Sequence, residues 1–585
     1  MCAIFTVINK NKKNLDFHRC KKALDLMTNR GPDWKIEKKI NNHVYLGQAV
    51  LSMTGSQKKK IDQHYSTSKN FFLLLVGEIY NYKKINSTYL KKINNINYSD
   101  SNVLVNLFEY VPKKKINSLL DGMYAYILYD KKQNTLSISR DPNGEKTLYT
   151  YEDNEKIIIS SEINPILFYN KKINLNFDIL KNYYLTRHFL ELDKTIFHGI
   201  KKIETGTQIE LNLSNLKFKI INKIKINDYI DSSIYNKNLK RSTEDVVEEL
   251  NFLFNKNIKE MIPENRKFAS IVSGGIDSSL VSNYICANSN PNYLIYLNHI
   301  KKDIHTDKIK IFEQFLKKKI HIHDVTEKKY FKNYLKSISI CNSPINSHSF
   351  VGQFMNANIV SKHNCRAIFG GEGADELFGG YDTYLSKNTK TNINYSAYTK
   401  INESTLFSDT KEQVFFKKHM NLQWKKCLSS YSFISDNENK QKLAMMLMDA
   451  TTQMESNAFK GSDLMSMNNS VEGRSLFYRR DIIKFALNLP IKFKINARAP
   501  ESMKTKFILK KLFLRKFPKK LILKKQGFAG FPNEMKKYVC SLDKFILNNY
   551  LSASKLKNKF YKDRETQWKI LNTELYLQKI GYKFL

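Results

Sequence analysis

The segment Ser273–Ser279 reads S-G-G-I-D-S-S and decides the fold of the second half of this 585-residue chain. It directly follows the apolar run Phe268–Val272 and leads into a helical pattern over Ser278–Ala287. Its two glycines let the backbone approach an anion closely, and the amides at a helix N-terminus supply hydrogen-bond donors. The segment therefore predicts a phosphate-binding turn between a buried strand and a helix.

The polar side chains of this turn fit the same chemistry. The hydroxyls of Ser273, Ser278 and Ser279 can donate to phosphate oxygens, and Asp277 suits a Mg²⁺ ion held against the phosphates. A capped strand-to-helix turn is the alternative, but two glycines, several hydroxyls and an acid in one turn favour the phosphate site. The pattern is neither the Walker loop nor the dinucleotide loop.

A second glycine-rich turn, Phe369–Tyr381, reads F-G-G-E-G-A-D-E-L-F-G-G-Y and follows a later apolar run. Ligands of open α/β sheets bind at the carboxyl ends of the strands, so both turns are expected to face one crevice. Five glycines and three acids are costly for a structural loop. Asp375 is the predicted second Mg²⁺ ligand, and Glu372 the predicted polar group near a reacting carbonyl.

Strand and helix patterns alternate on both sides of the first turn, which predicts a parallel, doubly wound sheet. From Asn388 onward the pattern is helical. The expected strands are Phe268–Val272, Tyr293–Asn298, Ile320–Val325 and Ala367–Phe369, and the expected helices are Ser278–Ala287, Lys308–Lys318, Asn356–Lys362, Gln441–Thr451 and Lys504–Arg515.

The first part of the chain is rich in short β-type runs interrupted by helical stretches, which predicts an α+β layered domain. It is followed by a lysine- and asparagine-rich connector, 212–240. The expected strands are Cys2–Ile8, Val44–Leu51, Phe71–Val76, Met123–Tyr129, Thr135–Ser139 and Ile157–Ser160, and the expected helices are Leu15–Thr28 and Ser101–Tyr110.

Length and composition predict two or three packed domains, because 585 residues exceed what one core supports. No apolar run approaches the roughly 20 residues that a membrane span needs, and the start of the chain lacks the basic region of a signal peptide. Seven cysteines without a C-x-x-C pair indicate a reducing compartment, so a cytoplasmic protein is expected.

The net charge of +41 suggests a nucleic-acid binder at first sight. However, the chain has 83 Lys and only 13 Arg, and its lysines are scattered in pairs and triplets. Nucleic-acid readout favours Arg, whose planar fork makes bidentate contacts. The composition therefore argues against specific nucleic-acid binding and for a lysine-rich proteome.

Taken together, the two turns resemble the synthetase domain of the glutamine-hydrolysing asparagine synthetase family, and the resemblance covers almost the whole chain. Further motifs occur in the family's order, beginning with Met1-Cys2. They are R-G-P-D (Arg30–Asp33), G-E-I-Y-N (Gly77–Asn81), S-D (Ser99, Asp100), G-M-Y-A-Y-I-L-Y-D (Gly122–Asp130), R-D-P-N-G (Arg140–Gly144), S-E (Ser161, Glu162), S-V-E-G-R (Ser470–Arg474), K-F-I-L-K (Lys506–Lys510) and K-K-Q-G-F (Lys524–Phe528).

This resemblance implies an N-terminal nucleophile αββα sandwich, residues 2–211, and an ATP-pyrophosphatase-type α/β domain with a helical C-terminal part, residues 241–585. Removal of Met1 would leave Cys2 as the first residue, with its own α-amine as a base. The implied partners are glutamine, ATP with Mg²⁺, and a carboxylate acceptor, with no membrane. Whether the chain forms a homodimer stays a hypothesis on which the sequence is silent.

The resemblance also assigns residues to the two sites. In the glutaminase half, the Gly77 amide is an oxyanion donor, and Glu78 and Asp100 hold glutamine. In the synthetase half, Glu372 lies near the reacting carbonyl, and Lys506, or as the alternative neighbouring Lys504, compensates the charge on the departing pyrophosphate. The implied ATP site consists of Val272, Ser273, Gly274, Gly275, Asp277, Ser278, Ser279, Leu297, Gly370 and Gly371, with Asp277 and Asp375 as metal ligands.

The chain departs from the family at the glutamine site. Val76 replaces an asparagine that supplies the second oxyanion donor, and Val50 replaces an arginine that clamps the substrate. Loss of one oxyanion donor typically costs about 10²–10³-fold in rate. A weakened or altered glutaminase is therefore expected.

The residues expected near the carboxylate acceptor also differ from those of the family. The segment Cys341–Phe354 lacks the family's threonine-rich stretch, and Leu476–Arg479 reads L-F-Y-R in place of P-F-L-D. Aspartate is the default acceptor, and another carboxylate, such as a sugar uronate or a specialised metabolite, is the alternative. A non-catalytic ATP-binding relative is a further alternative, against which the joint presence of Cys2, Asp277 and Lys506 weighs.

Overall fold

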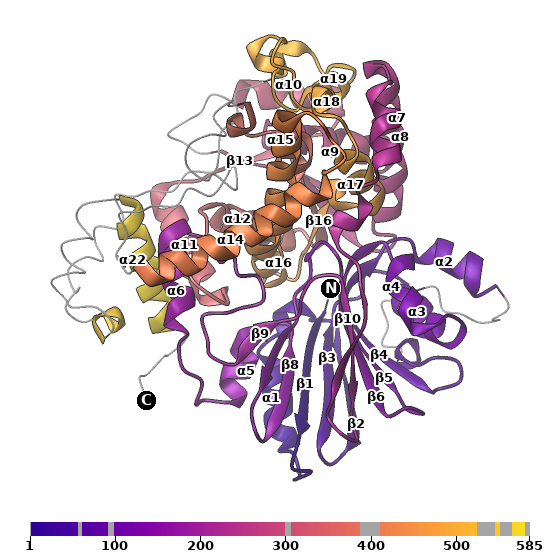
Figure 1. Cartoon of the computed structure of the whole chain (residues 1–585), viewed down its shortest axis with the longest axis vertical. Helices are drawn as coiled ribbons and strands as arrows, with labels where there is room; N and C mark the ends of the chain where they lie inside the picture. Colours follow the sequence, from indigo (N-terminus) through magenta and orange to yellow (C-terminus); the bar gives the residue numbers. More distant parts are fainter. Residues whose placement is uncertain are drawn as a thin grey trace.

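The structure of the chain is a computed structural model that describes residues 2–55, 61–91, 99–298, 306–385, 410–522, 545–549 and 564–579 (Figure 1). The K-K-Q-G-F motif, Lys524–Phe528, lies outside the described residues. Among the helices in these ranges, none combines the length and the apolarity required to cross a membrane.

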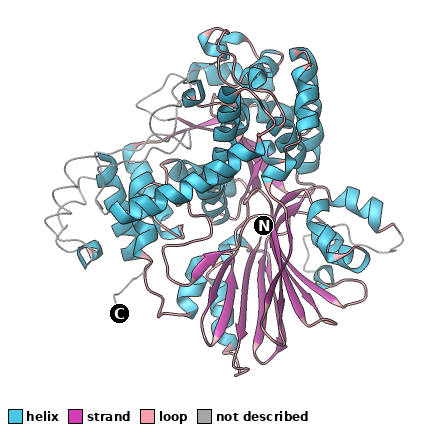
Figure 2. Cartoon of the chain, viewed as in Figure 1, coloured by secondary structure: helices cyan, strands magenta, loops and turns pink. Residues whose placement is uncertain are grey.

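The first part of the chain forms two antiparallel sheets (Figure 2). Each expected strand is present, and the predicted boundaries differ by a few residues. In spatial order, the first sheet contains β2 (Trp34–Asn41), β3 (Val44–Val50), β1 (Ala3–Asn9), β8 (Lys156–Ser160), β7 (Tyr149–Glu152) and β9 (Ile200–Lys202), and the second contains β11 (Phe218–Lys223), β10 (Thr207–Asn212), β6 (Thr135–Arg140), β5 (Gly122–Asp130) and β4 (Phe71–Ile79).

The alternation of side chains along the strands explains how the layers stack. Along β1, Phe5 and Val7 pack with the outer helices, whereas Ile4 and Ile8 pack with side chains of the second sheet. The αββα sandwich is thereby confirmed. The outer layers are α1 (Phe17–Asp25) and α5 (Ile163–Tyr169) on the first sheet, and α2 (Tyr82–Tyr89), α3 (Asp100–Tyr110) and α4 (Lys113–Leu119) near the second.

The expected connector, 212–240, carries secondary structure of its own. Strand β11 pairs with β10 and extends the second sheet, and α7 (Ser232–Leu239) begins at the capping residue Asp231. The side chains of β11 are half-buried or exposed, as befits an edge strand. Because β11 is exposed at the edge and partly polar, its hydrophobic pattern did not predict a strand.

The second half contains the predicted parallel sheet, in the order β14 (Ile320–Asp324), β13 (Tyr293–Asn298), β12 (Lys267–Ile271), β15 (Cys365–Gly370) and β16 (Glu472–Ser475). The chain runs outward from β12 to β14, and later returns to the other side of β12 with β15. Strands β12 and β15 are therefore neighbours at the point where the strand order reverses, which is where α/β sheets bind ligands.

Helices cover this sheet and make up most of the C-terminal part (Figure 1). They are α8 (Thr243–Met261), α9 (Ile276–Asn288), α10 (Thr306–Leu316), α11 (Glu327–Ile340), α12 (Ser349–Lys362), α13 (Ala374–Phe378), α14 (Thr410–Ser430), α15 (Asn437–Met448), a π-helix (Asp449–Phe459), α16 (Lys460–Met467), α17 (Arg480–Leu487), α18 (Ile491–Lys494), α19 (Phe507–Leu514) and α22 (Arg564–Lys579). Helix α6 (Phe177–Thr186) comes earlier in the chain and contacts α14.

Buried ion pairs join the two halves. The carboxylate of Asp463 on α16 forms ion pairs with the Arg30 guanidinium at 2.7 Å and with the Lys146 ammonium at 3.0 Å, both from the N-terminal sandwich. Arg479 reaches Asp121 of the sandwich at 2.7 Å. Each of these groups is nearly inaccessible to solvent, so the pairs fix the relative position of the halves and leave no charge unpaired.

We expect Asp463→Asn to destabilise the protein by about 3–5 kcal/mol, because Arg30 and Lys146 would remain buried without their shared carboxylate. Asp481→Asn is the matched control, since Asp481 pairs with Lys256 at the surface and exposed pairs contribute about 0–1 kcal/mol. Denaturant unfolding of both variants measures the difference. An equal, small loss in the two variants would contradict the structural role of Asp463.

Candidate active sites

The predicted phosphate-binding turn connects β12 to α9. Gly274 has φ +78°, a left-handed conformation that glycine adopts without strain. The Ser278 hydroxyl accepts a hydrogen bond from the Ser273 amide at 3.0 Å and lies 2.8 Å from the Ser273 hydroxyl. These contacts fix the conformation of the turn, and Gly275 is the N-cap residue of α9.

The second turn follows β15 and touches the first. A Cβ atom added to Gly371 would lie 2.8 Å from the Asp277 Cβ and the Ser278 amide, so only glycine permits this approach. Val272 lies buried at the end of β12, and Leu297 lies near the carboxyl end of β13. The structure therefore brings the two glycine-rich turns to one edge of the sheet, as predicted.

Lys506 joins the two turns. Its Nζ lies 2.5 Å from Asp277 Oδ2 and 2.7 Å from Asp375 Oδ1, and the residue is 6% exposed. Burial alone would lower the lysine pKa, but the two carboxylates raise it well above its usual range. Lys506 has φ +49°, which is strained for a lysine, and a Cβ on Gly380 would collide with the Lys506 Cε and Asp375.

The same two carboxylates fit a magnesium ion. They approach one cation from two separate turns, and Mg²⁺ is commonly bound by one or two carboxylates together with substrate phosphates. No cluster of three or more His, Cys, Asp or Glu side chains suited to a metal occurs in the described ranges. The donor set therefore suits a metal that arrives with phosphate oxygens.

Glu372 lies beside this cluster. Its carboxyl folds back over Gly370, where an added Cβ would come within 2.0 Å of Oε2. Burial raises the pKa of Glu372, opposed by a hydrogen bond from Gln353. Ser475 donates to the Glu372 carbonyl at 2.7 Å, which ties the turn to β16. The carboxyl is therefore buried at the edge of the sheet, beside the two glycine-rich turns.

Cys2 precedes β1 and lies in the apolar layer between the sheets of the sandwich. Its thiol contacts the Leu51 carbonyl at 4.0 Å, and burial raises its pKa. Val50 and Val76 belong to the same apolar cluster as Cys2. Where the resembled family places an arginine and an asparagine, this chain thus has two buried aliphatic side chains in the layer that holds the thiol.

Gly77 follows Val76 on β4 with φ +102°, and an added Cβ would lie 1.9 Å from the Met123 carbonyl. Only glycine fits this position, so the backbone at the expected oxyanion donor is fixed by its neighbour on β5. Asp100 is also fixed. It accepts hydrogen bonds from the Thr54 hydroxyl at 2.7 Å and the Ile79 amide at 3.1 Å.

Glu78 has a partner that the sequence did not reveal. Arg474 of β16 forms a buried ion pair with the Glu78 carboxylate and with Glu472 at 2.8 Å. Burial raises the pKa of Glu78 to about 8, despite the attraction of Arg474. The group expected to hold the glutamine amine is therefore connected to the strand that carries Ser475, the neighbour of Glu372.

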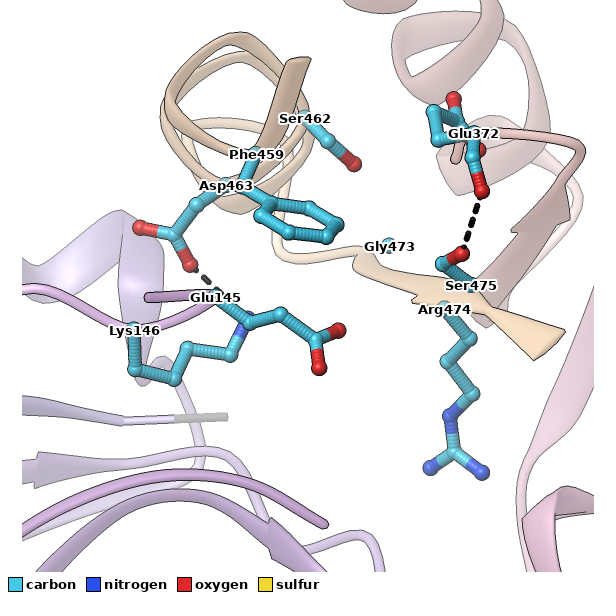
Figure 3. A pocket seen from close by; sticks show the side chains of 9 residues that line it. All are labelled: Glu145, Lys146, Glu372, Phe459, Ser462, Asp463, Gly473, Arg474 and Ser475. Carbon is cyan, nitrogen blue, oxygen red and sulfur yellow. Dashed lines mark hydrogen bonds and ion pairs between the residues drawn. The ribbon is translucent and has the colours of Figure 1, made fainter. Parts of the chain in front are cut away.

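A small cavity lies between the two sites (Figure 3). Glu145 and Lys146 line it from the sandwich, and Glu372, Arg474 and Ser475 from the parallel-sheet half. Its free volume of about 10 Å³ is close to that of one water-sized sphere. The side chain of Phe459 points toward its middle, and Lys146 reaches Asp463 on its wall (Figure 3).

Comparison with known proteins identifies a family for each half of the chain. The sequence model of a family described as "Glutamine amidotransferase domain" matches residues 1–220, and that of "Asparagine synthase" matches residues 249–577, more than half of the chain. A Bacillus subtilis protein named asparagine synthetase [glutamine-hydrolyzing] 1 is 22% identical over 94% of this chain and 92% of its own length.

Two further relatives match more partially. Asparagine synthetase [glutamine-hydrolyzing] 2 of Bacillus subtilis is 24% identical over 66% of this chain and 53% of its own length. A Gibberella zeae protein named amidase chry2 is 23% identical over 62% of this chain and 55% of its own length.

Fold, sites and comparisons define the class: a glutamine-dependent ligase that forms amide bonds, with an amidotransferase domain ahead of a synthetase domain. The chain belongs to the asparagine synthase family.

Proposed function

We propose that the chain is an ATP-dependent amide synthetase that adenylates a carboxylate and transfers glutamine nitrogen to it, releasing AMP and pyrophosphate. The observation that carries this proposal is the convergence of Asp277 and Asp375 on Lys506, at two glycine-rich turns on neighbouring strand ends. Anionic and cationic groups at that edge match triphosphate with its metal.

In this proposal the phosphates bind along Ser273–Ser279, with Leu297, Gly370 and Gly371 at the edges of the ATP site. Asp277 and Asp375 would hold Mg²⁺, which supplies charge neutralisation to phosphate oxygens. Lys506 would leave its two carboxylates and follow the departing pyrophosphate, since it is the buried cation nearest to both turns. A carboxylate oxygen of the acceptor attacks the α-phosphorus, and the acyl-adenylate forms as pyrophosphate leaves.

The nitrogen comes from the sandwich. After removal of Met1, the Cys2 thiolate attacks the side-chain amide of glutamine, and the Gly77 amide donates to the oxyanion. Glu78 and Asp100 would hold the glutamine amine. Collapse of the tetrahedral intermediate breaks the carbon–nitrogen bond, the leaving nitrogen takes up the proton that the thiol gave to the α-amine, and ammonia departs to leave a Cys2 thioester. Water then hydrolyses this thioester, which releases glutamate and restores the thiol.

Ammonia would pass through the cavity between the sites, whose free volume suits a molecule of that size. It attacks the acyl-adenylate carbon, and AMP leaves as the amide forms. Glu372, at the far wall of the cavity, would accept the proton that the attacking nitrogen loses. Burial raises the pKa of Glu372 above that of an ordinary carboxyl group, which makes its carboxylate a stronger base.

Aspartate is the proposed default acceptor, which would make asparagine the product. The departures in Cys341–Phe354 and Leu476–Arg479 favour a test of other carboxylates, including uronates. Release of pyrophosphate from ATP, measured with ammonia and a panel of acids, tests the proposal. Pyrophosphate release that depends on a carboxylic acid supports the synthetase. ATP binding without pyrophosphate release, whichever acid is added, would favour the non-catalytic alternative.

Val76→Asn is expected to raise glutaminase turnover by up to about 10²-fold, because Val76 shares the layer of Cys2 and a side-chain amide there could donate to the oxyanion that forms on the glutamine carbonyl. The gain should appear in kcat more than in KM, since the oxyanion exists only after attack. Val50→Arg should instead lower KM, because a substrate clamp acts in the ground state. Steady-state glutamate release measures both, and an unchanged kcat in Val76→Asn would show that another donor already serves the oxyanion.

A further inference from the structure

A second buried cavity lies where the N-terminal sandwich meets the segment that precedes α12. Tyr149 and Phe189 line it from the sandwich side, and Asn342, Ser343, Ser456 and Lys460 from the other. Its free volume of about 30 Å³ corresponds to roughly two water-sized spheres. None of the residues assigned to glutamine or ATP lines this cavity.

The walls of the cavity present hydrogen-bond donors without acceptors. Ser456 is 1% exposed, and its hydroxyl makes no hydrogen bond within the described chain. Asn342 is 2% exposed, and its Oδ1 accepts from the Ile163 amide at 3.1 Å, whereas its Nδ2 faces the Tyr149 hydroxyl on the cavity wall without a well-formed hydrogen bond. Buried donors of this kind cost free energy unless a ligand or water satisfies them.

Positive charge exceeds negative charge around the same cavity. Lys460 donates to the Ser343 hydroxyl and lies 4.8 Å from the centre of the Phe189 ring, with no carboxylate within ion-pair distance among the described residues. Lys202 also lines the cavity, and it shares its partner Glu455 with Arg140. One carboxylate thus serves two cations while Lys460 has none.

We propose that this cavity is a binding site for a small carboxylate-type monoanion, held by Lys460 Nζ, Asn342 Nδ2 and the Ser456 hydroxyl. The Ser343 hydroxyl already donates to the Pro344 carbonyl at 3.1 Å and serves to position Lys460. A planar carboxylate offers about four lone-pair sites, enough to accept from all three donors. The anion would join the sandwich to the segment before α12. Asn342 and Ser343 belong to the segment Cys341–Phe354 of the acceptor side, whereas no residue assigned to glutamine or ATP lines the cavity. The proposal therefore does not depend on the chemistry at Cys2 or at the ATP site.

The size of the cavity indicates which small anions it can hold. A carboxylate group has three heavy atoms and matches the free volume of about 30 Å³ better than a tetrahedral phosphate does. Acetate and bicarbonate carry the same chemistry from two sources, an organic acid and dissolved carbon dioxide. Separate titrations with each distinguish the sources.

Binding should require protonated Lys460. Burial lowers the pKa of this lysine to about 7, so anion affinity is expected to fall about hundredfold between pH 6 and pH 9. The charged and titratable groups that face it are Lys202 with Glu455, the buried Cys341 thiol, His188, Tyr149 and the Lys194–Glu191 pair. Burial lowers the pKa of His188 well below its usual range.

The test is a titration of the full-length protein with sodium acetate against sodium chloride at equal ionic strength, read by calorimetry and by Tm. Bicarbonate forms a second arm. We expect saturable, millimolar-range acetate binding to the wild type. Ser456→Ala should weaken it about tenfold and raise the Tm in chloride, because an unpaired buried hydroxyl is removed. Lys460→Met should abolish binding, and Lys336→Met, which removes an exposed charge elsewhere, should change nothing.

Three results would overturn the proposal. The first is an acetate effect on the wild type that does not saturate. The second is equal acetate affinity in the wild type, Ser456→Ala and Lys460→Met. The third is a lower Tm for Ser456→Ala in chloride, which would show that the hydroxyl is satisfied by the protein or its water rather than reserved for an anion. If bicarbonate binds and acetate does not, the organic-acid source is excluded and the anion site stands.

Discussion

Replacing Asp277 with Asn is expected to reduce pyrophosphate release by about 10³-fold or more with glutamine or ammonia as donor. The carboxylate would lose its charge, and with it both the proposed metal ligand and one of the two anions that position Lys506. Because adenylation precedes nitrogen transfer, the nitrogen donor should make no difference. Pyrophosphate release at saturating ATP measures the loss.

Asp382→Asn is the matched control, since Asp382 is an exposed acid just beyond the second turn. It should keep most of the activity. Asp375→Asn should resemble Asp277→Asn, because both carboxylates contact the same ammonium. An Asp277→Asn enzyme with near-normal pyrophosphate release would place the ATP site elsewhere.

Cys2→Ala is expected to remove glutamine-dependent amide formation and to leave ammonia-dependent formation intact. The thiol lies between the sheets of the sandwich, whereas the proposed adenylation residues lie at the edge of the parallel sheet. Removing the nucleophile should therefore stop one half-reaction only. Amide product measured with each nitrogen donor in parallel gives the result.

Cys20→Ala provides the control for a buried cysteine of the same domain, whose thiol lies 3.7 Å from the Tyr169 hydroxyl. Both activities should survive this change. Equal loss with glutamine and ammonia in Cys2→Ala would show instead that Cys2 supports the packing of the first strand.

Local patterns were sufficient to predict most of the architecture. The alternation of strands and helices around Ser273–Ser279 predicted the parallel sheet, because each buried strand is an apolar run followed by a helical period. The short strand β16 was not predicted, since Glu472–Ser475 is polar and short. Edge strand β11 was missed for a similar reason: its half-exposed side chains lack an apolar alternation.

The contacts between the halves could not be predicted from sequence. Arg474 appeared only as part of a motif, and its pairing with Glu78 spans 396 positions in the chain. Nothing local in either segment indicates that contact. The same holds for Lys506, whose pairing with two distant carboxylates depends on how α19 packs against the sheet.

The pairing of Arg474 with Glu78 changes how the glutamine site is understood. A glutamine ammonium at Glu78 would compete with a buried guanidinium on the strand that supports Glu372. The occupancy of one proposed site is thus physically connected to the backbone of the other.

The most direct test of the central claim is a reaction with ATP, an acid and glutamine labelled with ¹⁵N in its side-chain amide, followed by mass spectrometry and nucleotide analysis. Aspartate is the first acid to use, and the panel of other carboxylates follows. We predict an amide product one mass unit heavier than its unlabelled form, together with AMP and pyrophosphate in equal amounts. Release of ADP and phosphate, or an amide that carries no label while glutamine is consumed, would contradict the account.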